Sequence, residues 1–226
     1  MKIDFVLIQA AEPANVGSAA RAIKTMGFDK LIVIKSEAHT HKDARILAHG
    51  SNDILQNIEE YNSIDELKNK YDLLIATSSR ERSIRENFIP SHELTEFIRK
   101  REEKFENIAI IFGGEESGLS NEDLLKCDIV SYIHLADKYP SLNLSQAVMI
   151  YAYELSHIEK KEEKNRNKEI ISQKHYRKKI ETLFNEINLS SMPALKSKAF
   201  DMLIKQDVEN SKIVMSLINQ ILKKIR

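Results

Sequence analysis

The chain of 226 residues has a single cysteine, Cys127, and lacks any apolar stretch of bilayer-spanning length. One cysteine cannot form an intramolecular disulfide, and a membrane-spanning helix needs roughly 20 consecutive apolar residues. The N-terminal run Lys2-Ile3-Asp4-Phe5 is too short and too charged for a secretory signal. These absences argue against a disulfide-stabilised secreted domain and an integral membrane protein, so we expect a soluble cytoplasmic protein.

Several ligand-binding signatures are also missing. No Gly-x-Gly-x-x-Gly follows the first apolar run and no Gly-Lys-Ser/Thr loop occurs anywhere, which disfavours ordinary dinucleotide and nucleoside-triphosphate sites. His39 and His41 lie close together, but no set of cysteine, histidine and carboxylate residues has a familiar metal-ligand spacing. The sequence therefore predicts no metal site.

The formal net charge of zero hides two regions of opposite sign. Up to His157, 18 Lys+Arg face 25 Asp+Glu, a balance of −7, whereas from Ile158 onward 16 face 9, a balance of +7. The apolar pattern breaks at the same place, which predicts a first domain at 1–157 and a basic extension at 158–226. A basic extension on an acidic body indicates a polyanionic partner.

The extension has helical patterning throughout, over roughly 170–187, 193–204 and 207–225. Its densest basic patch lies in the first of these helices and includes Arg177, Lys178 and Lys179. Two interpretations stay open, because such a patch is either an RNA contact or a solvated helix face.

In the first domain, apolar runs of strand length alternate with segments that carry helix signals. The runs are 3–8, 31–34, 73–76, 108–112 and 129–135. They are continuous in apolar character, as is typical of strands buried on both faces. The pattern predicts an α/β fold, a parallel sheet flanked by helices, with ligands beyond the carboxyl ends of the strands.

Three ordered motifs and one further segment follow these runs. They are Asn15-Val16-Gly17-Ser18-Ala19-Ala20-Arg21, Phe112-Gly113-Gly114-Glu115-Glu116-Ser117-Gly118-Leu119, Ser141-Leu142-Asn143-Leu144-Ser145 and Thr77-Ser78-Ser79-Arg80. Because the carboxyl ends of parallel strands share one edge of a sheet, we expect these four loops to converge on one crevice.

The first motif predicts a helix start. If Asn15 caps that helix, Gly17 and Arg21 lie one turn apart on one face, and the glycine leaves clearance for a substrate backbone. The alternative is an ordinary surface arginine and a tolerated glycine.

The other two motifs also have two interpretations each. Gly113 and Gly114 would let main chain approach a ligand closely, and Glu115 either orients a neighbouring loop or is solvated. Asn143 with Gln146 could be a helix cap with its reciprocal partner and nothing more.

Taken together, the three motifs resemble the signatures of the ribose 2′-O (SpoU/TrmH) branch of the SPOUT superfamily of RNA methyltransferases. The resemblance covers about the first 157 residues. Residues 77–80, Tyr139 ahead of Ser141, and the helical extension are similar to the TrmJ-type enzymes. Those enzymes methylate the ribose of a cytidine or uridine at anticodon-loop position 32 of tRNA.

The resemblance implies a C-terminal trefoil knot in the α/β domain, with S-adenosyl-L-methionine bound inside it. It also implies a homodimer acting on tRNA or another structured RNA, with no DNA partner. The apolar run 148–151 could pack between the two subunits, or it could simply face the core of its own domain.

Site residues follow from the same resemblance. The methyl donor would lie against Thr77, Ser78, Ser79, Gly113, Ile133, Ser141, Leu142 and Asn143. The catalytic set would be Arg21, assisted by Ser141, Asn143 and Tyr139, and RNA would also contact Asn15 and Arg80. Because a guanidinium with a pKa above 12 is a poor base, we favour Arg21 as the group that orients and acidifies the hydroxyl over a literal proton acceptor.

Two other functions stay open. The nearer one is the same reaction on ribosomal RNA or on another tRNA position, since the motifs encode the reaction and leave the nucleotide open. The more distant one is a non-catalytic RNA-binding factor on the same fold.

Overall fold

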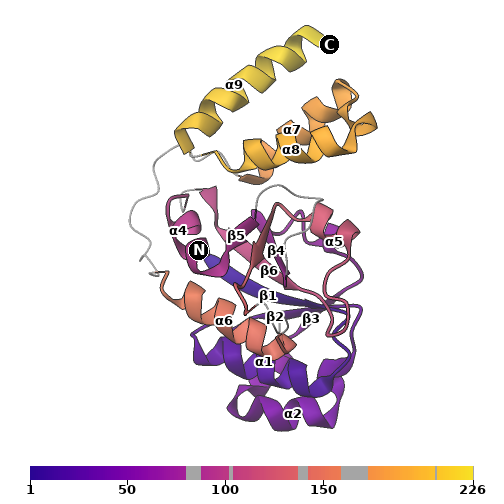
Figure 1. Ribbon diagram of the computed structural model, residues 1–226, viewed down its shortest axis with the longest axis vertical. Coiled ribbons are helices and arrows are strands. Elements are labelled where there is room, and N and C mark those ends of the chain that lie inside the picture. The colour runs from indigo at the N-terminus through magenta and orange to yellow at the C-terminus, as the bar shows by residue number, and fades with distance from the viewer. Residues whose placement is uncertain (80–87, 102–103, 137–141, 159–172, 207, 226) are drawn as a thin grey trace.

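The computed structural model describes residues 1–79, 88–101, 104–136, 142–158, 173–206 and 208–225 (Figure 1). Within these residues one sheet has the strand order β3-β2-β1-β6-β4-β7-β5, and every neighbouring pair is parallel. The strands are β1 (Lys2–Ile8), β2 (Leu31–Ile34), β3 (Glu59–Tyr61), β4 (Leu73–Ser78), β5 (Phe88–Pro90), β6 (Asn107–Phe112) and β7 (Ile129–Tyr132). The α/β prediction with a parallel sheet is confirmed.

Helices connect the strands and then continue alone. In the sheet region they are α1 (Pro13–Thr25), η1 (Ala38–Thr40), α2 (Lys42–Ala48), η2 (His49–Ser51), α3 (Asn52–Gln56), η3 (Ile64–Glu66), α4 (Ser91–Arg99), α5 (Asn121–Lys126) and α6 (Leu144–Ser156). Beyond them lie α7 (Gln173–Glu186), η5 (Leu189–Ser191), α8 (Pro193–Ile204) and α9 (Val208–Ile225), which Figure 1 shows together at one end of the molecule.

Both faces of the sheet are covered, and successive strand residues point to opposite faces. One face carries residues such as Phe5, Leu7 and Ile110 and packs under α1 and α6, which lie side by side. The other face carries Val6, Ile111 and their neighbours and packs under η3 and α5. The continuous apolar runs in the sequence follow from this double burial.

The two edge strands were absent from the sequence prediction. β3 and β5 are three residues each, and β5 ends in Pro90. Three residues are too few for an apolar run of the usual strand length, and a proline at an edge needs no ladder donor. The predicted strand 129–135 also ends early, at Tyr132, where its pairing with β4 and β5 ends.

The helical extension is anchored to the amino edge of the sheet by a buried ion pair. Arg177 on α7 is 5% exposed and pairs with Asp128, which is 2% exposed and directly precedes β7. The same guanidinium donates to the carbonyls of Lys68, Tyr71 and Asp72, which precede β4. The prediction of Arg177 as an RNA contact is therefore wrong, because its charge is buried and engaged within the protein.

A second contact ties α8 to the segment after α4. Arg101 donates to the Lys205 carbonyl at 2.6 Å and 3.1 Å, and Lys104, which is buried, donates to the Gln206 carbonyl. Across the part of the chain that the structure describes, none of the helices has both the length and the apolar character to span a membrane.

Candidate functional site

The sequence motifs meet at the carboxyl edge of three adjacent strands, β6, β4 and β7. Gly113 directly follows β6, Thr77 and Ser78 end β4, and Ile133 directly follows β7. Register holds these ends side by side, since Ser78 pairs with Tyr132 and Ala76 pairs with Ile111. The strand ends that carry the second motif and residues 77–79 therefore lie side by side, as the sequence predicted.

Glu115 of the second motif caps the helix that carries the first motif. Its carboxylate accepts hydrogen bonds from the backbone N–H groups of Ala11 at 3.0 Å and Glu12 at 3.3 Å, next to the start of α1 at Pro13. A carboxylate at a helix N-terminus is favourable, because the helix dipole places partial positive charge there. Of the two interpretations of Glu115, the structure supports the one in which it orients a neighbouring segment.

A relay of hydrogen bonds then joins all three motifs. Asn15 Nδ2 donates to Glu115 Oε1 at 2.9 Å, and Asn143 Nδ2 donates to Asn15 Oδ1 at 2.8 Å. Asn143 also caps α6, since its Oδ1 accepts from the Ser145 N–H at 2.9 Å and its N–H donates to Gln146 at 3.2 Å. Asn143 is therefore both the predicted cap and a link between two helix N-termini.

The relay requires Glu115 as a carboxylate, because all its partners are donors. Partial burial acts to raise the pKa of the Glu115 carboxyl, but the hydrogen bonds from Asn15 and from the Ala11 and Glu12 backbone outweigh it. The pKa of Glu115 therefore lies below its ordinary value of 4.5. Near neutral pH the relay is built on a fixed negative charge.

Asn15 differs from its prediction in two ways. The helix begins at Pro13, so Asn15 lies within the first turn and is not the cap. It is 8% exposed, and its amide nitrogen and amide oxygen each form a hydrogen bond with another side chain. Asn15 is therefore unsuited to the predicted RNA contact. Its role is to hold the second and third motifs together.

The motif glycines make room for the protein's own backbone. A Cβ on Gly113 would lie 2.0 Å from the carbonyl carbon of Gly118, and one on Gly114 would lie 2.7 Å from the Gln9 oxygen. A Cβ on Gly17 would lie 2.1 Å from the Ala44 oxygen of α2. The prediction that Gly17 clears space for a substrate backbone is wrong, since α2 occupies that space, and the clearance at Gly113 and Gly114 is taken up in the same way.

Arg21 lies on the exposed surface of α1, outside the relay. It follows Gly17 by four residues and precedes Lys24 by three, and both of those residues contact the α2–α3 region. Helical periodicity therefore places Arg21 on the α2 side of α1. No hydrogen bond or ion pair to its guanidinium is found within the described ranges, so the guanidinium is available to a ligand.

The remaining residues implied for the cofactor suit its chemistry. Ile133, directly after β7, and Leu142, shortly before α6, are half-buried apolar side chains, and Ser79, directly after β4, is exposed. Thr77 Oγ1 donates to the Ile111 carbonyl at 3.0 Å, so this hydroxyl ties β4 to β6. Apolar walls with a few polar groups fit an adenosine. The predicted residues Arg80, Tyr139 and Ser141 lie outside the described residues.

Of the predicted RNA contacts in the extension, two lysines remain accessible. Lys178 is exposed and Lys179 is half-buried, next to the buried Arg177. His39 and His41 face Glu60 at 3.3 Å and Asp43 at 3.5 Å. Among the residues that the structure covers, no group of three potential metal ligands occurs.

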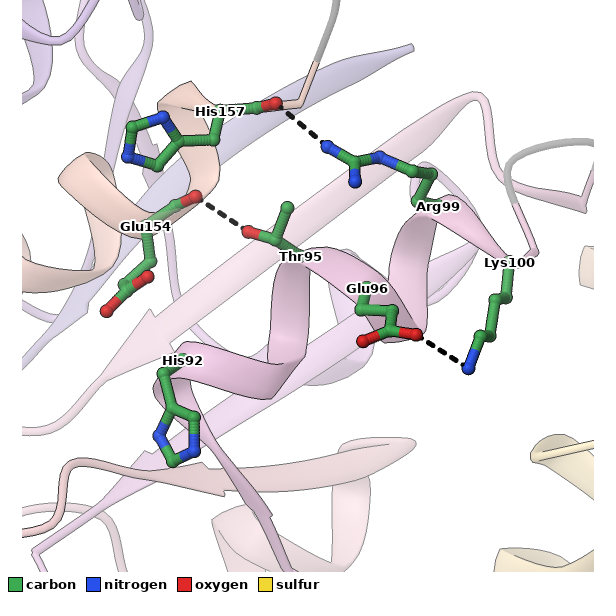
Figure 2. A pocket seen from close by; sticks show the side chains of 7 residues that line it. All are labelled: His92, Thr95, Glu96, Arg99, Lys100, Glu154 and His157. Carbon is green, nitrogen blue, oxygen red and sulfur yellow. Dashed lines mark hydrogen bonds and ion pairs between the residues drawn. The ribbon is translucent and has the colours of Figure 1, made fainter.

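A cavity of about 430 Å³ lies away from the motifs, between α4 and the C-terminal end of α6 (Figure 2). Thr95 Oγ1 donates to the Glu154 carbonyl at 2.6 Å and Arg99 donates to the His157 carbonyl at 3.2 Å, as Figure 2 shows. None of its lining residues belongs to the three motifs. The candidate site is therefore defined by the motif relay and not by this cavity.

Comparison with known proteins gives matches over the same region. The model of a family described as SpoU rRNA Methylase family matches residues 2–153. The uncharacterized tRNA/rRNA methyltransferase LasT of Escherichia coli K12 is 38% identical over 69% of this chain and 68% of its own length. The tRNA (cytidine-2′-O-)-methyltransferase TrmJ of Methanocaldococcus jannaschii is 35% identical over 68% of this chain and 66% of its own.

Solved structures show the same fold. TrmJ from Z. mobilis ZM4 has a TM-score of 0.72 at 20% identity, and the match covers 98% of this chain and 99% of that one. An AdoMet-bound rRNA methyltransferase from Sinorhizobium meliloti has a TM-score of 0.53 at 18% identity, covering 68% of this chain and 55% of its own. The curated relatives are thus matched over about two thirds of their own length, whereas the Z. mobilis structure is matched over nearly all of its length.

Proposed function

The chain belongs to the SpoU rRNA Methylase family, and from that premise we propose that it transfers a methyl group from S-adenosyl-L-methionine to a ribose 2′-hydroxyl of RNA. The family is one of S-adenosyl-L-methionine-dependent RNA methyltransferases, which confirms the resemblance drawn from the three motifs. The substrate we propose is tRNA, and most specifically the pyrimidine at anticodon-loop position 32. The M. jannaschii relative, a tRNA (cytidine-2′-O-)-methyltransferase, supports the tRNA assignment.

The observation that carries this proposal is the relay from Glu115 through Asn15 to Asn143. It brings the three motifs to one place and points the N-termini of α1 and α6 at it. A side-chain amide held at both ends cannot rotate, so the relay supplies the preorganisation that an in-line transfer needs.

For the cofactor, we propose that Ile133 and Leu142 contact the adenine and that Thr77, Ser78, Ser79 and the backbone after Gly113 give polar contacts. Ser141, which the family resemblance implies for cofactor binding, belongs to the same proposal. The bound sulfonium would supply the methyl group in activated form. The protein's own task is then to hold a weak nucleophile in line and to ease loss of its proton. The trefoil knot implied by the family resemblance is part of this proposal.

We assign that task to Arg21. Its guanidinium is always charged near neutral pH, so it can orient a ribose hydroxyl and lower that hydroxyl's pKa, but it is a poor acceptor of the proton. Asn143, Tyr139 and Ser141 would assist by hydrogen bonding. The exposed position of Arg21, outside the relay of its own chain, supports contact with RNA or with a site that a second subunit completes.

We propose that the protein works as a homodimer. In the run 148–151, Val148 and Tyr151 are buried in the core of their own subunit, whereas Met149 and Ile150 are only half-buried. Tyr153 on the same helix is 53% exposed. The half-buried part of α6 supports a subunit contact, and the buried part accounts for the alternative, core-facing interpretation. Action on tRNA would place the protein in the cytoplasm.

The first test is Arg21→Ala, measured as methyl transfer to tRNA and as S-adenosyl-L-methionine affinity. We expect cofactor affinity within about twofold of wild type and transfer lower by roughly three to four orders of magnitude, comparable to the loss of an essential catalytic group. Lys2→Ala is the control, because it also removes an exposed cation but lies at the amino edge of the sheet. Near-wild-type turnover in Arg21→Ala would remove this residue from the mechanism.

The second test identifies the nucleotide. Mass spectrometry of tRNA and ribosomal RNA from cells lacking this protein would show which 2′-O-methyl group disappears. Loss at tRNA position 32 is the expected result. Loss in ribosomal RNA instead would favour the other substrate class, which the tRNA/rRNA name of the E. coli relative keeps open.

A further inference from the structure

The packing of α2 on α1 determines what surrounds Arg21. Gly17 lies so close to α2 that a Cβ would be 2.1 Å from the Ala44 oxygen. Two turns later, Lys24 Nζ donates to the Gly50 carbonyl at 2.9 Å and pairs with Asp53 at 2.6 Å. Arg21 lies between these two contacts on the same side of α1. The neighbouring surface of Arg21 is therefore α2, which Figure 1 shows outermost beyond α1.

The outward face of α2 is cationic with apolar side chains between the charges. Ala44 and Ala48 are buried, which turns Lys42, Arg45 and Ile46 to solvent. Ile46 is 55% exposed. Within the described ranges neither Lys42 nor Arg45 forms an ion pair, and the nearby acid Asp43 lies 3.5 Å from His41. Uncompensated cations stand out on a region whose sequence balance is −7.

His49, which follows α2, is held in a conformation that suits glycine. Its backbone has φ 50° and ψ −121°, although an L side chain rarely adopts positive φ. The geometry is maintained by Asn52 Nδ2, which donates to the His49 carbonyl at 2.7 Å, and by the Lys24 contact to the next carbonyl. The imidazole is exposed. Strained backbone of this kind clusters at ligand sites, where the surroundings hold a side chain in place.

We propose that Lys42, Arg45 and His49 form an RNA-backbone surface beside Arg21, here called the α1–α2 surface, which holds the phosphates next to the target nucleotide. The proposal rests on the proposed function and deepens it by extending the RNA contact beyond the motifs. Charge complementarity determines the occupant, because unpaired cations at helical spacing match a polyanion. Ile46 and the neighbouring Leu47, which is 42% exposed, give apolar contact to ribose.

The test is the double variant Lys42→Ala/Arg45→Ala in the full-length protein, with an unmodified tRNA transcript as probe. Each lost phosphate contact should make the slope of log affinity against log salt concentration less negative by roughly 0.7 to 0.9. We therefore expect a change of about 1.4 to 1.8, a raised KM for tRNA and unchanged S-adenosyl-L-methionine affinity. A slope equal to that of wild type would overturn the proposal.

The matched control is Lys2→Ala/Lys100→Ala, which also removes two exposed cations. Lys2 begins β1 at the amino edge of the sheet, and the Lys100 side chain is 67% exposed at the end of α4. We expect the control to leave the salt slope unchanged. An equal slope change in the control would overturn the proposal, because the effect would then reflect net charge alone.

His49→Gly tests the strained position separately. Glycine adopts this backbone without cost, so the thermal midpoint should stay the same or rise while tRNA affinity falls. Unchanged affinity would remove His49 from the surface. If sedimentation showed that the Lys42→Ala/Arg45→Ala variant alters subunit association without altering tRNA affinity, the face would be a contact between copies of the chain, and the proposal would fail. Failure of the proposed function is distinguishable, because wild-type protein would then methylate no RNA.

Discussion

The two edges of the sheet each hold a charged side chain that bonds backbone groups, and the two serve different ends. At the carboxyl edge, Glu115 accepts hydrogen bonds from the backbone N–H groups just before α1 and connects the three motifs. At the amino edge, Arg177 donates to carbonyls before β4 and pairs with Asp128. Glu115 is part-exposed and arranges the site, whereas Arg177 is buried and attaches the helical extension.

The function of a charged residue in the sequence becomes clear only when the burial of its side chain is known. Arg177, Lys178 and Lys179 are equivalent in a count of cations, yet only the first lies inside the protein. The helical pattern carries the signal that the charge count misses. Arg177 precedes Ile180 by three residues and Phe184 by seven, which puts it on the buried face of α7.

The largest effect on stability is expected at the amino edge. Arg177→Ala would leave Asp128 buried without its cationic partner, so we expect the free energy of unfolding to fall by about 3 to 5 kcal/mol, measured by urea denaturation near neutral pH. The double variant Arg177→Met/Asp128→Leu should recover most of that loss, since it removes both charges. Equal losses in the single and double variants would mean that packing, and not the ion pair, anchors the extension.

A smaller loss of stability with a larger loss of activity is expected at the carboxyl edge. Glu115→Gln keeps the shape but leaves one of three donors without an acceptor, so the free energy of unfolding should fall by about 1 to 2 kcal/mol. Methyl transfer should fall further, because Asn15 and Asn143 lose their fixed orientation. Glu116→Gln, exposed in the next position, is the control. Equal activity of the two variants would contradict the positioning role.

The same residue predicts a pH dependence. Because the pKa of Glu115 is lowered in the folded protein, its contribution to stability is complete above its ordinary value of 4.5 and is lost as pH falls through the lower, folded value. The stability difference between wild type and Glu115→Gln should therefore be constant near neutral pH and shrink in acid. Denaturation series at about pH 7 and about pH 3.5 would measure it.

The smallest effect on stability is expected for the accessible lysines of α7. Lys178→Ala/Lys179→Ala should change the free energy of unfolding by less than about 0.5 kcal/mol. If these lysines contact RNA, the salt slope of tRNA binding becomes less negative by up to about 1.8. An unchanged slope would assign them to a solvated helix face, and would restrict RNA contact to the sheet domain.

The sequence predicted the central strands of the sheet but missed its two edge strands. Five apolar runs coincide with β1, β2, β4, β6 and β7, because strands buried on both faces must be apolar throughout. The edge strands β3 and β5 are fixed by tertiary pairing with β2 and β7, and their three residues carry no pattern of their own. The capping signal at the start of α6 was correct, since Asn143 with Gln146 forms the expected box, whereas the one at Asn15 was not, because α1 begins earlier, at Pro13.

The motifs in the sequence predicted where in the fold the candidate site lies, but they did not predict which groups each site residue contacts. The sequence left Glu115 undecided because the two backbone N–H groups it binds lie more than 100 residues earlier. It assigned the space beside Gly17 to a substrate, because nothing local shows that α2 packs there. Contacts between distant segments depend on the fold, so residue type and spacing alone could not predict them.

The order of the relay along the chain has a consequence during synthesis. Asn15 is made 128 residues before Asn143, its hydrogen-bond partner. At about 5 to 20 residues per second, Asn15 waits roughly 6 to 26 s for that partner to be made. Until then the Asn15 amide lacks that hydrogen bond, and the nascent chain cannot have an assembled relay. Methylation competence therefore arrives late in translation, only once the α/β domain is nearly complete.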